Sequence, residues 1–147
     1  MPSIIEKKNI LMLAGAASIA FAGMFGSASA DQVADGEKLF KRCVACHSLE
    51  AGKNKVGPSL AGIIGRKSGT APGYKYSDLN HHAGEAGLVW TPEHIVDYLP
   101  DPNAFLTNYL KENGKADEAK GRTKMTFRMP KQEDREAIAA YLASLPQ

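Results

Sequence analysis

Residues 43–47 read Cys-Val-Ala-Cys-His, and this stretch decides what kind of domain the chain forms. Two cysteines three positions apart, followed at once by a histidine, make the C-x-x-C-H pattern of covalent haem attachment. On about one helical turn, each thiol can add across one haem vinyl group, and the adjacent histidine then reaches the iron. We therefore predict one c-type haem, attached through Cys43 and Cys46, with His47 as an axial ligand.

Two other kinds of site use a similar cysteine spacing. A redox dithiol of the thioredoxin kind belongs in a βαβ context, whereas no strand pattern persists in this chain. A zinc site needs two further Cys or His ligands at suitable spacing. The chain has no other cysteine, and His81 and His82 are neighbours without a second Cys pair. Haem attachment is the favoured interpretation.

The N-terminal part of the chain differs in character from the rest. Lysines precede an apolar run over residues 10–25, and the small residues Ala-Ser-Ala end at Ala30. This order is typical of a signal peptide and its cleavage site. We therefore expect residues 1–30 to be removed after Ala30, leaving residues 31–147 as one domain in the periplasm. An uncleaved anchor is the alternative, but the apolar run is shorter than the roughly 20 residues of a membrane span.

Charge and size narrow the possible functions. The chain has 147 residues and a formal net charge of +2, which argues against a nucleic-acid partner, because such binders carry a strong basic excess. Export places the two cysteines in an oxidising compartment, where a disulfide is the usual expectation, but their spacing favours haem. A domain this small buries a limited core and gains stability from a bound cofactor.

Elimination reduces the candidates for the second axial ligand to a few residues. Three of the five methionines lie in the expected signal peptide, which leaves Met125 and Met129. The other candidates are the histidines His81, His82 and His94. Met125 lies in a polar loop over residues 121–127, whereas a methionine that fills a core gap would more naturally lie on a periodic apolar face. A thioether opposite a histidine also raises the iron potential, which suits an electron acceptor. Met125 is therefore the favoured ligand.

Helix patterns and turn residues predict an all-α domain. The expected helices cover residues 33–43, a short turn over 77–82, 91–100, 101–113 and a final amphipathic stretch around 138–145. Residues 114–124 are expected to form a charged loop. The irregular stretch over residues 48–76 is rich in Gly, Lys and Pro, and a loop that long is usually functional. Wrapping a flat cofactor is one such function.

Beyond the motif, an ordered series of segments resembles the class I cytochromes c, and most closely the larger bacterial members of the c-two type. The matching segments are residues 36–40, 43–47, 56–60, 65–69, 71–74, Trp90, 98–99, 123–125 and 140–142. The resemblance implies a single-domain fold of four to five helices, with long loops wrapped around one covalently bound haem. It also implies that Gly36 and Phe40 cross against Tyr141 near the other end of the chain. The stretch between Pro102 and Met125 is longer than in the compact mitochondrial members.

The resemblance also implies which residues surround the haem. Besides the motif and Met125, they are Pro58, Arg66, Tyr76, Asn80, Trp90, Tyr98 and Thr123. The Pro58 carbonyl would accept a hydrogen bond from His47 Nδ1, which fixes the tautomer. The residues expected to bond a buried haem propionate are Arg66, Tyr76 and Trp90. The polar network expected beside the methionine comprises Asn80, Tyr98 and Thr123.

With both axial positions filled by the protein, we expect an electron carrier and not an enzyme. The expected role is a periplasmic shuttle between a quinol-oxidising cytochrome bc complex, or a periplasmic dehydrogenase, and a terminal oxidase or photosynthetic reaction centre. The alternative is a haem peroxidase or gas-binding sensor with a labile sixth ligand. We expect a monomer that meets membranes only through its partners and docks on their acidic faces. The basic residues that match the family's docking positions are Arg42, Lys55, Lys124 and Lys131.

Overall fold

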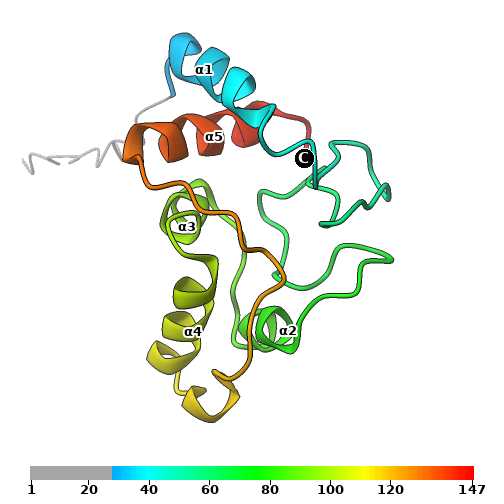
Figure 1. Ribbon diagram of the computed structural model, residues 1–147, viewed down its shortest axis with the longest axis vertical. Coiled ribbons are helices and arrows are strands. Elements are labelled where there is room, and N and C mark those ends of the chain that lie inside the picture. The colour runs from blue at the N-terminus through cyan, green and yellow to red at the C-terminus, as the bar shows by residue number, and fades with distance from the viewer. Residues whose placement is uncertain (1–27) are drawn as a thin grey trace, which may run out of the picture.

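The structure, a computed structural model, describes residues 28–147 (Figure 1). Its helices are α1 (Ala30–Phe40), α2 (Asp78–Glu85), α3 (Pro92–Tyr98), α4 (Pro102–Glu112), the 3₁₀ helix η1 (Ala116–Glu118) and α5 (Gln132–Ser144). The described residues contain no strand, only an isolated bridge between Lys67 and Val89. The predicted all-α class is therefore confirmed. Most of the predicted signal peptide, residues 1–27, lies outside the described residues.

Local sequence explains the helix starts. Thr91 and Asp101 are the N-caps of α3 and α4, and a proline follows each of them at the first helical position. Ser77 caps α2 in the same way, since its hydroxyl accepts a hydrogen bond from the Asn80 backbone N–H. These three starts are as predicted from the sequence.

The predicted bounds of three helices and one predicted loop were wrong. The final helix, expected around residues 138–145, is α5 and runs from Gln132 to Ser144. α1 begins at Ala30, because Ser29 caps it, and ends at Phe40 instead of residue 43, because the chain then tightens into turns. α2 continues past residue 82 to Glu85. Part of the predicted charged loop forms η1. Each difference depends on short-range hydrogen bonding that apolar periodicity does not report.

The crossing of α1 over α5 joins the two ends of the domain (Figure 1). The helices touch at Gly36, where an added Cβ would lie 2.0 Å from the carbonyl oxygen of Ala137. Beside it, the rings of Phe40 and Tyr141 are 5.4 Å apart between centroids. Only a residue without a side chain allows this approach, so the crossing expected from the resemblance is present.

Two irregular segments face each other between the helices. The attachment segment, residues 41–60, follows α1, and the strap, residues 119–131, returns from η1 to α5 in orange in Figure 1. The apolar core of the domain includes Leu79, Leu106, Leu110, Ile138 and Leu142. Within residues 28–147, none of the helices has the length and apolar character needed to cross a membrane.

Candidate functional site

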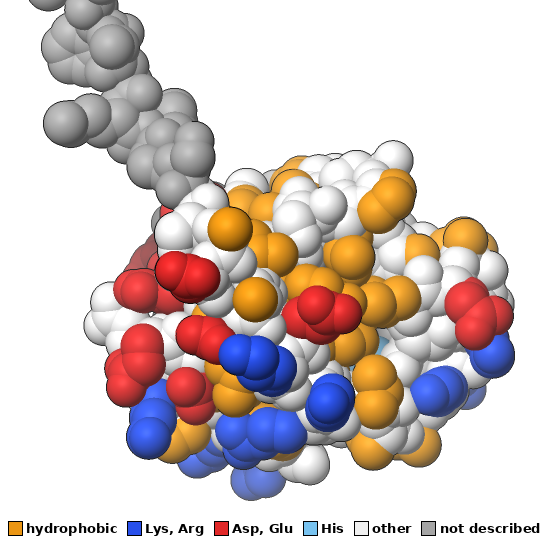
Figure 2. Space-filling view, turned by 90° about the horizontal axis from the view of Figure 1, so that it is seen from above, with side chains coloured by type: hydrophobic (Ala, Val, Ile, Leu, Met, Phe, Trp, Pro, Cys, Tyr) orange, Lys and Arg blue, Asp and Glu red, His pale blue; other side chains and the backbone are white. Residues whose placement is uncertain are grey.

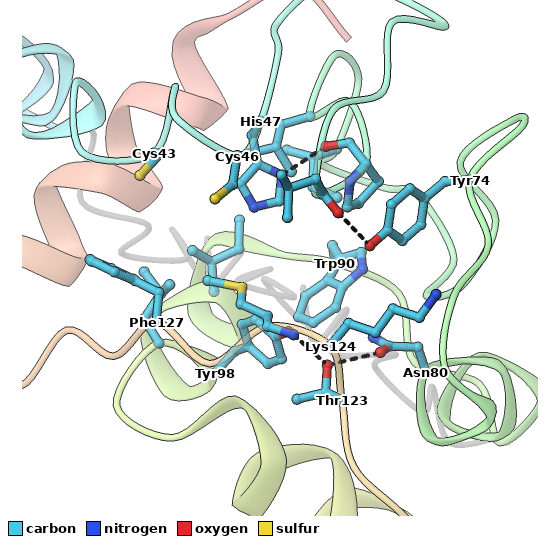
Figure 3. Close-up of a pocket in the computed structure, with 18 of the residues that line it drawn as sticks. Cys43, Cys46, His47, Tyr74, Asn80, Trp90, Tyr98, Thr123, Lys124 and Phe127 are labelled. Atoms are coloured by element: carbon cyan, nitrogen blue, oxygen red, sulfur yellow. Dashed lines mark hydrogen bonds between the residues drawn. The ribbon is translucent and has the colours of Figure 1, made fainter.

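The attachment segment and the strap enclose a cavity of about 260 Å³ (Figure 3). It is lined by all the site residues predicted from the sequence: Cys43, Cys46, His47, Pro58, Arg66, Tyr76, Asn80, Trp90, Tyr98, Thr123 and Met125. Residues that are far apart in the chain therefore surround one space. Figure 3 shows Cys43, Cys46 and His47 on one side of it, with Thr123 and Phe127, which flank Met125 in sequence, on the other.

Close spacing and local turns bring the motif side chains to the cavity. The backbone N–H groups of Cys46 and His47 both donate to the carbonyl of Cys43, at 3.1 and 2.9 Å, which makes one helical turn of the motif. Burial raises the pKa of the Cys43 thiol to about 11, whereas Cys46 is exposed. A reactive dithiol needs a cysteine with a lowered pKa, so this environment argues against the thioredoxin-like alternative.

The imidazole of His47 is held in one orientation. Its Nδ1 lies 2.7 Å from the carbonyl oxygen of Pro58. Burial lowers the pKa of His47, and the nearby charges of Arg66 and Lys55 lower it further, while the Pro58 hydrogen bond opposes them. The ring is therefore neutral, Nδ1–H donates to Pro58, and Nε2 keeps the lone pair that a metal requires.

Gly57 is a functional residue that the sequence interpretation did not single out. A Cβ there would lie 2.5 Å from Cε1 and 2.8 Å from Nδ1 of His47. The backbone of Gly57 therefore packs flat against the imidazole and leaves no room for a side chain. Its position directly before Pro58, within the matching segment 56–60, was the available signal. Tyr74 and Phe127 also line the cavity without having been predicted to do so.

The strap is positioned by contacts from distant parts of the chain. Asn103 accepts a hydrogen bond from the Thr123 backbone N–H at 3.0 Å, and the Thr123 hydroxyl donates to Asn80 Oδ1 at 3.1 Å. The backbone N–H of Met125 in turn donates to the Thr123 hydroxyl at 3.4 Å. Tyr98 joins this network: burial raises its pKa to about 12, although its contacts with Thr123 and Asn80 act in the opposite direction.

Of the candidate second ligands, only Met125 lines the cavity. Met129 is fully buried in the core, and its backbone N–H donates to the carbonyl of Leu99 at 2.8 Å. The histidines contact other groups: His81 the ring of Tyr76, His82 the carbonyl of Glu118, and His94 the carbonyl of Val89. Met125 is therefore the one candidate that the described structure brings to the cavity, and its role as an iron ligand stays a prediction.

The hydrogen bonding of Arg66 indicates whether the cavity suits an anionic cofactor. Its Nη1 and Nη2 donate to the carbonyls of Ala61 and Ser59, at 3.1 and 2.8 Å. Its Nε is buried and has no hydrogen-bond partner among the described residues. Burial also lowers the pKa of this guanidinium. A carboxylate in the cavity would satisfy Nε and offset the charge, so the residues present fit a haem with a propionate at Arg66, beside Tyr76 and Trp90.

Known proteins resemble this chain over almost the whole described domain. The Cytochrome c family model matches residues 33–93. A cytochrome c2 of Rhodopseudomonas palustris is 51% identical over 138 residues, which are 94% of this chain and 98% of that protein. The solved structure of ferricytochrome c2 from Rhodopseudomonas palustris has 57% identity and a TM-score of 0.73, over 77% of this chain and 97% of its own. The solved structure of cytochrome c2 from Rhodospirillum centenum has 53% identity and a TM-score of 0.76, over 78% of this chain and 98% of its own.

Sequence, cavity and relatives lead to one assignment. The C-x-x-C-H turn, the fit of Arg66 to a carboxylate and the identity to cytochromes c2 concern different features of the molecule. The all-α helices match those of the solved relatives over nearly their full length. The chain therefore belongs to the class I c-type cytochromes of the c2 type, which are electron carriers with a covalently attached haem c.

Proposed function

We propose that this cytochrome is a periplasmic one-electron shuttle. It would take electrons from a quinol-oxidising cytochrome bc complex, or a periplasmic dehydrogenase, and deliver them to a terminal oxidase or photosynthetic reaction centre. The observation that carries this proposal is the pairing of His47 and Met125 in one cavity, because two protein ligands leave no open position for a substrate. The bound haem supplies one-electron cycling between ferrous and ferric iron.

In this proposal the protein holds the cofactor and limits rearrangement. Cys43 and Cys46 form the two thioether links, and Pro58 keeps the imidazole of His47 in its ligating tautomer. Met125 is the second ligand, on a strap fixed through Thr123. Because the same two ligands would be held in the ferrous and the ferric state, the site would need little structural reorganisation when an electron is gained or lost.

Charges near the cavity mouth suit acidic partners. Val56 lines the cavity and is 77% exposed, which provides a small apolar contact at the edge. The cations expected to dock are all exposed: Arg42, Lys55, Lys124 and Lys131. Two of them, Arg42 and Lys124, line the cavity. Figure 2 shows lysine and arginine side chains gathered along one edge of a face of the molecule. Such a charge distribution steers association and yields small, short-lived complexes.

The location rests on the proposed cleavage after Ala30. Cleavage there would remove Ser29, whose hydroxyl accepts a hydrogen bond from the Gln32 backbone N–H and caps α1. Asp31 would remain in the first turn, where a carboxylate interacts favourably with the helix dipole. Mass spectrometry of the periplasmic fraction should find a mature chain that begins at Asp31. A membrane-bound protein that retains its first residues would contradict the location and leave the haem chemistry unchanged.

The carrier is distinguished from a peroxidase or gas sensor by ligand binding. We expect the reduced holoprotein to bind no carbon monoxide at neutral pH, because Met125 occupies the sixth position. We also expect its oxidation by membranes of the source organism to slow steeply as salt rises, since steering is screened. Stoichiometric carbon monoxide binding by the native protein would contradict the proposed function.

A further inference from the structure

A second cluster of polar side chains lies where α2 meets η1, away from the haem cavity. His82 and Glu85 are three residues apart on α2 and therefore share a face of the helix. Glu118 reaches them from η1. One potential metal-ligand atom from each of the three residues lies within 4.8 Å of the others. None of the three lines the haem cavity.

Within the described residues, only one of the two carboxylate oxygens of Glu118 has a hydrogen-bond partner. Its Oε1 accepts a hydrogen bond from Lys115 Nζ at 2.9 Å. Its Oε2 is buried and has no hydrogen-bond partner within residues 28–147. A buried oxygen of this kind costs free energy unless a donor or a cation meets it. The side chains beside it are another carboxylate and an imidazole, which are metal-binding groups.

The ring of His82 is oriented by the same segment. Its Nδ1 lies 3.3 Å from the backbone carbonyl oxygen of Glu118, so Nδ1–H can donate there. The other ring nitrogen then keeps its lone pair. A ligating histidine commonly gives its second N–H to a carbonyl or carboxylate in this way. His82 is half-buried, which also restricts its side chain.

The local charge favours a divalent cation. Glu85 and Glu118 contribute two negative charges, and Lys115 offsets one of them. One imidazole with two carboxylates is a ligand set that suits Zn²⁺, with water completing the coordination. We propose that His82, Glu85 and Glu118 form a binding site for a divalent cation of the zinc class, which links α2 to η1.

Such a cation would restrain the polar insertion that precedes the strap. Glu118 ends η1, and the strap follows directly after it. α2 already contacts the strap through Asn80, which accepts a hydrogen bond from the Thr123 hydroxyl. A metal shared by α2 and η1 would therefore add a second link at the start of the same segment. The expected consequence is a more stable holoprotein, independent of the identity of the haem ligands.

The test is a titration of untagged ferric holoprotein with Zn²⁺ by calorimetry. We expect one Zn²⁺ per chain, and at least a tenfold loss of affinity in His82→Gln and in Glu85→Gln. Glu85 is exposed, so its variant stays informative even where His82→Gln impairs folding. The matched control is His81→Gln, because His81 is adjacent and exposed but outside the cluster. Its affinity for Zn²⁺ should be unchanged.

Two further measurements test whether the bound cation stabilises the protein and whether the site prefers Zn²⁺. At a Zn²⁺ concentration of about 100 times the Kd, the unfolding constant of the native protein should fall about a hundredfold, and that of Glu85→Gln should not. Ca²⁺ should bind at least tenfold more weakly than Zn²⁺, because it prefers oxygen ligands. The proposal is overturned if no Zn²⁺ binds, if binding survives both cluster variants, or if His81→Gln abolishes it. Equal affinity for Ca²⁺ would overturn the zinc-class assignment.

Discussion

The two sides of the haem cavity are built in different ways. On the attachment side, Cys43, Cys46 and His47 are placed by one turn of backbone, and the hydrogen bond to Pro58 spans only eleven residues. On the strap side, the segment carrying Met125 is fixed through Thr123 by side chains 20 and 43 residues away. The attachment side is therefore encoded locally, whereas the strap side exists only when the whole domain has folded.

This contrast predicts which property a substitution on each side of the cavity should change. Changes on the attachment side should affect whether haem is held at all, or how the imidazole is oriented. Changes on the strap side should loosen the second ligand while the haem stays attached.

The largest effect is expected from Cys46→Ala. Only one thioether could then form, so we expect most of the holoprotein to be lost. The measurement is covalently bound haem per polypeptide, by mass spectrometry and by haem staining after denaturation. Any holoprotein that remains should show a single link through Cys43. Full yield of haem that resists acid-acetone extraction would contradict the attachment through two cysteines.

A smaller effect on the same side is expected from Gly57→Ala. The new Cβ would lie 2.5 Å from the His47 ring, so the imidazole or its loop must move. Overpacking of this kind costs about 1–3 kcal/mol, to be measured as the change in free energy of unfolding of the holoprotein. The control is Val56→Ala, whose side chain is 77% exposed and should cost at most about 0.5 kcal/mol. Equal effects of the two variants would argue against the packing of Gly57 on the imidazole.

The smallest effect is expected on the strap side, from Thr123→Val. This change keeps the shape of a buried side chain but removes its hydrogen bonds to Asn80 and to the Met125 backbone. The expected cost is about 1–2 kcal/mol. The weak red absorption band of methionine–iron ligation should disappear at a lower denaturant concentration than in the native protein, before the His47 side is lost. Thr126→Val, on the exposed part of the strap, is the control and should leave the band's midpoint unchanged.

The same contrast explains what could be predicted from the sequence. The motif is contiguous, and three helix starts carry cap residues, so both were visible in the chain. The choice of Met125 over Met129 rested on loop character and on family resemblance, and the structure adds the burial of Met129 against the backbone of Leu99.

The features that were missed depend on residues that are brought close together only in the folded structure. Gly57 matters because the imidazole of His47 packs directly onto its backbone. The cluster of His82 with Glu118 joins residues 36 positions apart, and the sequence pattern gave no sign of it. Distances of this kind follow from the packed fold and from no local periodicity.

The central claim is that Met125, and not Met129, ligates the iron. The direct measurement is the red absorption band, together with the reduction potential, of Met125→Ala and Met129→Leu. Met125→Ala should lose the band, and its potential should fall, because a harder ligand favours ferric iron; each 59 mV is a tenfold change in the equilibrium constant. Met129→Leu should keep the band and lose less than about 1.5 kcal/mol of stability. Loss of the band in Met129→Leu, with its retention in Met125→Ala, would contradict the account.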